Sequence, residues 1–476
     1  MAESEKTLFN PIVASEKLHP SFEDLRTSPG AEPARWMLDE IYRSFEDPEG
    51  NFLEQFQTTG FDARYFELYL FAYFSRSGFT VDRTRPNPDF LVSREGITVA
   101  VEATTVNPAT SGALAKFGKE VSELTDEELR EYQKNELPIR FGSPLFSKFQ
   151  KNYWKLDHCR DLPFVLAIEA FHDEESLVFS DSALTRYLFG LEQTGIWTQD
   201  GELEIDSTSV KQHTVGEKII PSNFFGQAGT EYISAVMFTN SGTNAKFARM
   251  GYQHGVGCDV IDITRSGFCF NPDPDAMDPT FFSYNLNEPP LVESWGQGLV
   301  VFHNPNCLHP VPKDFFVDTV QSYIEGGSLA SDCPGWHPIA SKTYILYLGE
   351  IKQKLADMLP RRMPRLAIGA ITKLEFRAAC SFAIPDPNPI GEEQGWFSDE
   401  TDSFLGVIIR DKIDNDWGFV VLARDEIFRF RAIEFECSFA TRDQARLELL
   451  TKIAGLLSSP QRIFPQGDWD LIPESG

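Results

Sequence analysis

Three acidic residues lie in otherwise apolar segments of the chain between residues 61 and 106. Glu67 lies in the aromatic run FDARYFELYLFAYF, Asp89 follows Pro88, and Glu102 comes near the end of the run ITVAVEA. An ionised carboxylate is costly to remove from water unless a proton, a cation or hydrogen-bond donors accompany it. This stretch is therefore where the sequence most needs a functional explanation.

The pattern around two of these acids predicts that they meet at the end of a β-hairpin. Strands are predicted over Asp89 to Ser93 and Ile97 to Thr104, with a tight turn at residues 94–96 between them. Side chains alternate along a strand, so Glu102 and Thr104 share a face and Asp89 can lie beside them. Two converging carboxylates repel each other unless a proton or a cation intervenes. Carboxylate oxygens suit Mg²⁺ or Mn²⁺, which can activate water and stabilise a phosphoryl transition state.

The elements that must hold these acids can also be predicted. A helix runs from its N-cap Asp62 to Arg76, is apolar nearly all round, and ends at Ser77-Gly78. A strand at 79–82 precedes the hairpin, and a buried strand is predicted over 162–170. Between them, a helix over 143–157 places Lys148, Lys151 and Lys155 on one face, because residues three and four positions apart lie on the same side of a helix.

The acids and the order of these elements resemble a known family. Pro88-Asp89 followed by Glu102-Ala103-Thr104, after a helix bearing Glu67, is similar to the motif of the PD-(D/E)xK nuclease superfamily, which has the restriction-endonuclease-like fold. The order helix, three strands, helix, strand resembles the αβββαβ core of that family over residues 62–170. The resemblance implies an α/β fold with a mixed sheet flanked by helices.

The resemblance also implies roles for individual residues. Asp89 and Glu102 would bind the metal, Ala103 would offer its backbone carbonyl, and Glu67 would complete or support the metal shell. Thr104 stands where the family usually has a lysine and cannot supply its charge. In some members the lysine comes from the following helix, which here points to Lys148 first and Lys151 second.

The function implied by the resemblance is Mg²⁺- or Mn²⁺-dependent hydrolysis of phosphodiester bonds, with DNA as the expected substrate. The lysine face, together with Arg140, Tyr153 and Trp154, would contact the nucleic-acid backbone, although a charged face can also be merely solvated. One alternative is an inactive relative that binds nucleic acid or a protein partner. Thr104 and the net charge of -28 favour that alternative. A second alternative is an unrelated fold whose many Phe side chains serve assembly, including homo-oligomerisation.

Simpler structural explanations exist for each acid taken alone. Asp89 after Pro88 can be an ordinary turn residue. Glu67 can form an ion pair with Arg64 or Arg76 in its own helix. Glu102 is harder to explain in this way, because it ends a strand of apolar and small residues.

Composition excludes several classes of protein. A net charge of -28 argues against a protein that coats nucleic acid generally, while leaving room for a local basic groove. The seven Cys residues are scattered and form no CxxC pair, which favours reduced thiols and a cytoplasmic location. The N-terminal sequence lacks the apolar region of a secretory signal, and no run approaches the ~18 apolar residues of a membrane span.

The 476 residues predict more than one domain. We expect a helical lead-in over 1–60 that begins as a loose arm to Pro33, a nuclease-like domain over 61–350 with its core at 61–170, and a small α+β domain over 365–462. The boundary is expected at 360–364. Further predictions are strands at 233–239 and 298–303, a loop at 267–290 and a helix at 342–357. The last domain is predicted to have strands at 367–383, 404–412, 417–423 and 429–434, and a helix at 441–457 with Thr441 as its N-cap.

Overall fold

The fold is known from a computed structural model of the whole chain. It describes residues 6–108, 124–171, 181–197, 203–258, 260–271, 279–286, 293–347, 396–398, 404–410, 417–424 and 430–441, together with 444–445, 447–449 and 451–452. These residues form two compact units. The first contains residues 1–258, 266–281 and 289–343, and the second contains 259–265, 282–288 and 344–476.

The first unit combines helices with a large sheet, so the chain has a mixed α/β fold. Its helices are α1 (Pro20–Thr27), α2 (Glu32–Arg43), α3 (Phe52–Gln57), α4 (Phe61–Arg76), α5 (Asp126–Glu131), α6 (Leu137–Phe149), α7 (Ser182–Phe189) and α8 (Asn244–Gln253). The strands of its main sheet are β1 (Thr80–Asp82), β2 (Phe90–Arg94), β3 (Ile97–Val106), β4 (Phe164–Ala170), β9 (Ala235–Thr239), β12 (Leu299–His303), β13 (Val320–Glu325) and β14 (Ser328–Asp332).

The main sheet has eight strands in the order β1-β2-β3-β4-β9-β12-β13-β14. The first three strands form an antiparallel meander, β3 pairs in parallel with β4, and β4 pairs in parallel with β9. The β2–β3 turn uses Glu95 and Gly96, both with positive φ, which is the combination that joins two strands through a tight two-residue turn. Two short hairpins also occur in this unit, β5 (Leu191–Trp197) with β6 (Leu203–Ser209) and β7 (Gln212–Val215) with β8 (Lys218–Pro221).

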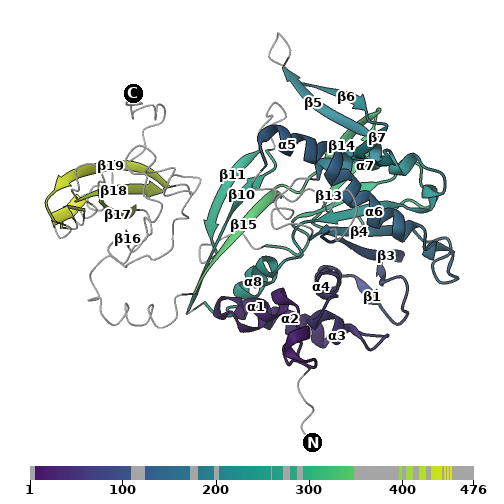
Figure 1. Cartoon of the computed structure of the whole chain (residues 1–476), viewed down its shortest axis with the longest axis horizontal. Coiled ribbons are helices and arrows are strands. Elements are labelled where there is room, and N and C mark those ends of the chain that lie inside the picture. Colours follow the sequence, from purple (N-terminus) through teal and green to yellow (C-terminus); the bar gives the residue numbers. More distant parts are fainter. Residues whose placement is uncertain are drawn as a thin grey trace, which may run out of the picture. The chain divides into compact units, whose positions relative to one another are not determined.

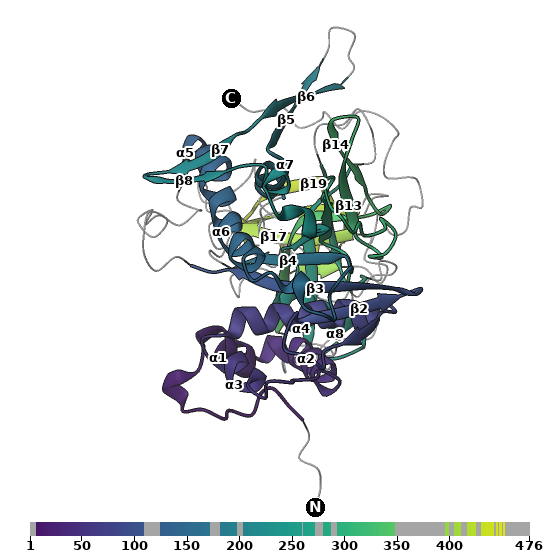
Figure 2. The same ribbon diagram turned by 90° about the vertical axis from the view of Figure 1, so that its right-hand side faces the viewer.

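Helices cover both faces of this sheet. Helices α1 to α4 and α8 lie on one side, and α5 to α7 lie on the other (Figures 1 and 2). Helix α4 packs on β3 on the first side, while α6 packs on β3 and β4 on the second. Strand β3 is therefore covered by a different helix on each face.

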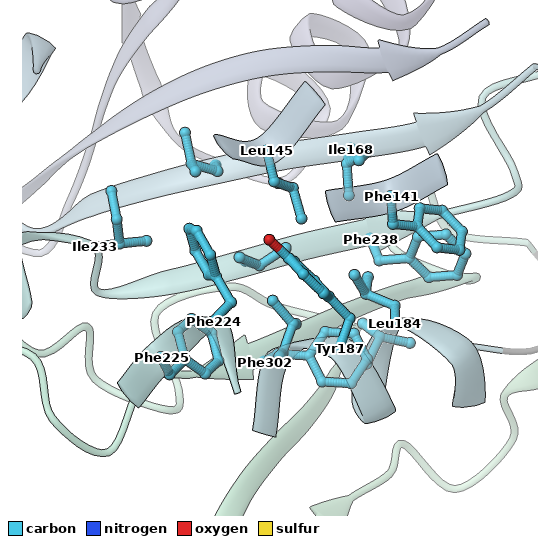
Figure 3. Close-up of a cluster of buried hydrophobic side chains, with 14 of the residues drawn as sticks. Phe141, Leu145, Ile168, Leu184, Tyr187, Phe224, Phe225, Ile233, Phe238 and Phe302 are labelled. Atoms are coloured by element: carbon cyan, nitrogen blue, oxygen red, sulfur yellow. The ribbon is translucent and has the colours of Figure 1, made fainter. Parts of the chain in front are cut away.

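The face covered by α6 and α7 carries a large aromatic core. Figure 3 shows Phe141 and Leu145 of α6 and Tyr187 of α7 meeting side chains such as Ile168 and Phe238 from the strands. The rings of Phe141 and Phe238 meet edge-on with their centroids 5.5 Å apart. Aromatic pairs of this kind add to the free energy gained by burying their area, and they fix α6 on the sheet.

On the opposite face, α4 is buried nearly all round, as its sequence predicts. Every residue from Tyr65 to Phe74 is buried. The helix begins after Gly60 rather than at Asp62, which lies in its first turn. The segment before it is not a loose arm, because Leu8, Phe22 and Leu25 are fully buried. The N-terminal helices therefore form the outer layer over α4.

Three further sequence predictions are wrong within the described residues. Residues 267–290 are not simply a loop, because β10 (Ile261–Cys269) and β11 (Thr280–Asn285) extend into this region. Residues 342–347 belong to strand β15 (Pro338–Tyr347) rather than to a helix, and residues 348–357 lie outside the described part. The helix predicted over 143–157 ends at Phe149, because the chain turns at Asn152, which has a left-handed conformation. Strands β10, β11 and β15 form a three-stranded sheet in the order β11-β10-β15.

The second unit contains an antiparallel sheet of four strands in sequence order. They are β16 (Trp396–Ser398), β17 (Phe404–Arg410), β18 (Trp417–Arg424) and β19 (Phe430–Phe439). The described residues between 444 and 452 are helical, and the hydroxyl of Thr441 accepts a hydrogen bond from the amide of Gln444, which supports the predicted N-cap. The strand predicted at 367–383 and the boundary at 360–364 lie outside the described residues. Among the helices that the structure describes, none has the length and apolar character needed to cross a membrane.

Candidate active site

The register of the β2–β3 hairpin brings Asp89 and Glu102 together. Phe90 pairs with Val101 in this antiparallel ladder. Asp89 immediately precedes Phe90 and Glu102 immediately follows Val101, so the two acids lie opposite each other where the ladder ends. The sequence prediction that these carboxylates share one place is therefore confirmed by the pairing.

Each carboxylate holds the backbone of the other acid's strand. Asp89 Oδ2 accepts a hydrogen bond of 2.8 Å from the amide of Ala103, and Glu102 Oε2 accepts one of 3.2 Å from the amide of Asp89. The amide and carbonyl of one strand residue point to the same side of the strand, so the Ala103 carbonyl also lies on the side of Asp89. Two carboxylates and one carbonyl thus gather at the end of β2.

The cation nearest to these acids comes from helix α6. Lys148 Nζ lies 2.6 Å from Glu102 Oε1, although the two residues are 46 positions apart in the sequence. Glu102 is only 2% exposed, so this ion pair is formed largely away from water. Lys148 occupies the last turn of α6, and the packing of α6 on β3 and β4 brings that turn to the end of β3.

Glu67 approaches from the other face of the sheet and is held by two arginines. Its Oε1 accepts a hydrogen bond of 2.7 Å from Arg64, one turn earlier in α4. Its Oε2 lies 3.2 Å from Arg83 in the loop before β2. Of the two expected partners, Arg64 is present, and Arg83 takes the place proposed for Arg76. Both oxygens of Glu67 are occupied, so in this conformation it supports the site.

Arg83 joins the separate parts of the site. Its Nε donates a hydrogen bond of 3.1 Å to the carbonyl of Asp89, and its guanidinium lies over the rings of Phe45 and Phe90, with its centre 3.7 and 4.9 Å from their centroids. Contacts of this kind fix the plane of a guanidinium group. One buried arginine thereby sets the position of both Glu67 and the main chain of Asp89.

Burial and mutual repulsion shift the proton affinities of the acids. Loss of water, followed by the nearby charge of Asp89, raises the pKa of Glu102 to about 8. The same two causes raise the pKa of Glu67 to about 7, with Arg64 and Arg83 opposing the shift. Burial lowers the pKa of Lys148, but the charges of Glu102 and Asp89 outweigh it and raise this pKa overall. The cluster therefore attracts cations, and shifted acids of this kind are typical of functional sites.

These residues line a cavity of about 300 Å³. Its walls come from the α2–α3 turn, from α3 and α4, from the loop before β2, from β3 and from the end of α6. The lining residues are Asp47, Pro48, Glu49, Phe52, Gln55, Ala63, Arg64, Phe66, Glu67, Arg83, Arg85, Pro86, Asn87, Asp89, Glu102, Ala103, Thr104, Thr105, Lys148 and Tyr153. All of the predicted acids, and Ala103, thus face one hollow.

Several predicted basic residues are not brought to this cavity. Lys151 lies in the turn after α6 and is exposed, and Lys155 lies in the following 3-10 helix (Tyr153–Lys155), so the predicted lysine stripe does not form. Arg140 forms an ion pair with Glu136, 2.5 Å away, and Trp154 is buried in the core. Of the lysine candidates, only Lys148 lines the cavity.

Two arginines that line the cavity are absent from the predicted site, although Arg64 is expected as an ion-pair partner of Glu67. Arg83 lies six residues before Asp89 and Arg64 lies three before Glu67. The spacing of Arg64 and Glu67 on a helix is the local signal that predicts their ion pair, because such residues are neighbours on its surface. The contact between Arg83 and Glu67 depends on how the loop before β2 crosses α4, and no local pattern reports it.

The cluster has the donor set that Mg²⁺ or Mn²⁺ uses with few protein ligands. Mg²⁺ is commonly held by one or two carboxylates, with the remaining positions left to water and phosphate oxygens. Asp89, Glu102 and the Ala103 carbonyl offer such a set. Among the residues that the structure describes, no group of three or more His, Cys, Asp or Glu side chains is arranged to enclose a metal ion. Any metal here would therefore depend on the backbone, water and substrate for its other ligands.

The comparisons cover protein-family models, curated proteins and solved structures. None of them finds a match for this chain. The chemistry of the site therefore rests on its own residues and geometry.

Proposed function

We propose that this protein is a metal-dependent nuclease with a restriction-endonuclease-like core that hydrolyses phosphodiester bonds in DNA. The order α4, β1, β2, β3, α6, β4, with the short helix α5 inserted before α6, supports this core, as does the pairing of an antiparallel β1–β2–β3 meander with a parallel β4. Fold alone does not imply activity, so the proposal rests on the site.

The observation that carries the proposal is the meeting of Asp89, Glu102 and Lys148 at one end of β3. Thr104 leaves the usual lysine position without a positive charge, and Lys148 Nζ reaches the site from α6, 2.6 Å from Glu102. This helix packs firmly through Phe141 and Leu145, so the position of the ammonium group is set by the core.

Each residue has a role in the proposed reaction. Asp89, Glu102 and the Ala103 carbonyl would hold Mg²⁺ or Mn²⁺, which would neutralise the charge that develops on the phosphate. Lys148 would donate a hydrogen bond from Nζ to the attacking water and keep its oxygen directed at phosphorus. Glu67 and Arg83 would hold Asp89 in place. Hydrolysis adds the water oxygen to phosphorus, breaks one P–O ester bond and leaves a proton on the departing oxygen.

The direct test measures DNA cleavage with Mg²⁺ or Mn²⁺, with EDTA as the metal-free control. Asp89→Ala and Lys148→Ala are expected to lower the cleavage rate by at least about a hundredfold, the low end of what a positioned catalytic group contributes. Asp157→Ala is the surface control, because Asp157 is 94% exposed and pairs only with Arg160 in the described contacts. Cleavage that survives Asp89→Ala would overturn the site assignment.

Comparison of two lysines tests which one serves the site. Lys148→Ala is expected to lower the cleavage rate by at least about a hundredfold, whereas Lys151→Ala, a change in the exposed turn three residues later, is expected to have a much smaller effect. A loss confined to Lys151→Ala would mean that the end of α6 rearranges when substrate binds.

A second candidate function is a nuclease-like protein that binds nucleic acid or a protein partner without catalysis. The observation that favours it is the internal neutralisation of the acids, Glu102 by Lys148 and Glu67 by Arg64 and Arg83. Isothermal titration with Mg²⁺ and Mn²⁺ separates the two functions. Binding that is lost in Asp89→Ala supports the nuclease, and the absence of metal binding supports the second candidate.

A further inference from the structure

The charges that line the cavity suit a ligand with a single phosphate. The lining has four cationic side chains (Arg64, Arg83, Arg85 and Lys148) and five carboxylates (Asp47, Glu49, Glu67, Asp89 and Glu102). One divalent cation would leave this lining with a formal charge of about plus one, the complement of one phosphodiester. Duplex-binding proteins instead contact many phosphates along a basic surface.

Two of the four cations are each held by several protein partners. Arg64 donates hydrogen bonds to Glu67 and Gln55, both at 2.7 Å. Arg83 donates to Glu67 and to the carbonyls of Asp89 and Glu46. Lys148 has one partner, Glu102 Oε1 at 2.6 Å, so its other N–H donors remain for a ligand. Arg85 is about half exposed and has an ion pair of 3.3 Å with Asp82 at the protein surface.

The cavity wall contributed by the α2–α3 turn is acidic. Asp47 accepts hydrogen bonds from the amides of Gly50 and Phe52, each 2.9 Å long, which fixes the shape of this turn. Glu49 is 46% exposed and lies 3.9 Å from Arg64. A second phosphate strand passing over this wall would meet negative charge, because like charges across an interface disfavour association.

An aromatic side chain completes the wall near Lys148. Tyr153 begins the 3-10 helix that follows the left-handed Asn152, it lines the cavity, and it is half-buried. Bases of unpaired strands are commonly held by stacking on aromatic rings, a contact that a base inside a duplex cannot make. The ring therefore offers a place for a single exposed base.

We propose that the cavity accepts one unpaired nucleotide at a time, so that the substrate is a single strand or a frayed end rather than intact duplex. This inference rests on the proposed nuclease function for its reaction. The volume of about 300 Å³ is at the lower end of the range for small-molecule pockets, which agrees with a ligand of nucleotide size.

The experiment compares one labelled DNA 20-mer, free and annealed to its complement, in cleavage with Mg²⁺ and in binding measured by fluorescence anisotropy with Ca²⁺ in place of Mg²⁺, so that a divalent cation is present in both measurements. We expect the single strand to be preferred by at least about tenfold in kcat/KM and in affinity. Equal or better use of the duplex would overturn the inference.

The same experiment separates the two proposals. Preferential binding of the single strand without any cleavage would remove the nuclease function and leave the ligand class standing. Cleavage with no preference for the single strand would support the nuclease function and overturn the inference that the ligand is an unpaired nucleotide. Neither binding nor cleavage of the two DNA forms would overturn both.

Charge variants test the part played by the acidic wall. Glu49→Lys is expected to improve binding and cleavage of the duplex, and so to reduce the preference for the single strand by about threefold or more. Glu54→Lys makes the same charge change on the neighbouring helix, but Glu54 is exposed and does not line the cavity. An equal effect of both variants would show that net charge, rather than the wall, sets the preference.

Variants of Tyr153 test the stacking surface. Tyr153→Ala is expected to raise the KM for the single strand by about tenfold, within the range of base-stacking contributions, with a smaller change in kcat. Tyr153→Phe keeps the ring and should preserve the KM. Equal losses in the two variants would show that the hydroxyl group, not the ring, is what matters.

Discussion

Burial of Glu102 carries an electrostatic cost for the fold. Its pKa in the folded protein is about 8, above the ordinary value of 4.5, mainly because it is buried. The stability that this group contributes is therefore complete below pH 4.5 and is lost as pH rises through about 8. A divalent cation can replace the proton, so protons and metal should compete at this carboxylate.

This competition predicts a pH-dependent stabilisation by Mg²⁺. At pH 8.5, saturating Mg²⁺ should raise Tm by about 2–5 °C, and at pH 6 by clearly less. Differential scanning fluorimetry at the two pH values, with and without EDTA, makes the measurement. Glu102→Gln should remove most of the difference. A Mg²⁺ shift of the same size at both pH values would contradict the competition.

A second buried acid, Glu169, lies at the end of β4 and carries an unsatisfied oxygen. Its Oε1 accepts a hydrogen bond of 2.6 Å from the amide of Gly242, and its Oε2 has no hydrogen-bond partner among the described residues. Burial holds the pKa of Glu169 well above its ordinary value, so the neutral acid is the stable form in the fold. The backbone must come close here, because a Cβ on Gly242 would collide with the carboxyl group.

For Glu169 we predict that, at alkaline pH, the fold is more stable with Gln at this position than with the ionised native carboxylate. Stability from the native acid is complete below its unfolded pKa and declines as pH rises towards its raised folded pKa. Urea unfolding of wild type and Glu169→Gln at pH 5.5 and 8.5 should show a smaller loss of stability with pH in the variant. Parallel losses in both proteins would contradict this assignment.

At the scale of elements, the close approach of α6 and α7 positions the end of α6 that carries Lys148. Gly142 permits this approach, since a Cβ there would lie 2.7 Å from the ring of Tyr187 and 2.8 Å from Ile220 Cδ1. Inserting a methyl group into such packing forces neighbouring side chains to move. Helix packing and the position of Lys148 beside Glu102 are therefore linked through one glycine.

The corresponding prediction is that Gly142→Ala lowers the free energy of unfolding by about 1–3 kcal/mol. Ser147→Ala, at an exposed position in the same helix, should change it by less than about 0.5 kcal/mol. Chemical denaturation followed by circular dichroism measures both. An unchanged free energy of unfolding in Gly142→Ala would mean that α7 can move away from α6 without loss of stability.

Local sequence patterns were sufficient for the elements that hold the acids. Alternation and the Glu95-Gly96 turn predicted the β2–β3 hairpin, and the aromatic run predicted α4. Local patterns do not predict strands whose pairing partners lie far away in the sequence. Strand β10 pairs with β15, about 75 residues later, and its interior contains Arg265 and Gly267, which hide the strand pattern. No local pattern predicts the position of Lys148 against Glu102, because it depends on how α6 packs and where it ends.

At the scale of the whole molecule, the net charge of -28 opposes compaction. Repulsion among carboxylates is screened by salt, since the Debye length falls from about 30 Å at 0.01 M to about 8 Å at 0.15 M ionic strength. We expect Tm to rise by a few degrees when NaCl is increased from about 0.01 to 0.15 M. Sodium chloride should be used without divalent ions, so that screening is separated from metal binding. A falling Tm would show that attractive ion pairs dominate.

Strand β3 continues beyond Val101, where its pairing with β2 ends. At that point the carboxylate of Asp89 accepts the hydrogen bond of the next inward-facing β3 amide, that of Ala103. The amide of Ala100 points to β4 and donates to the carbonyl of Pro163, so that of Ala103 points the other way, to Asp89. The side chain of Asp89 thus provides the acceptor that a longer β2 strand would otherwise provide with its backbone. Isotope exchange at the Ala103 amide should therefore report the state of Asp89 without any substrate: slow in the native protein, fast in Asp89→Ala, with the Ala100 amide slow in both.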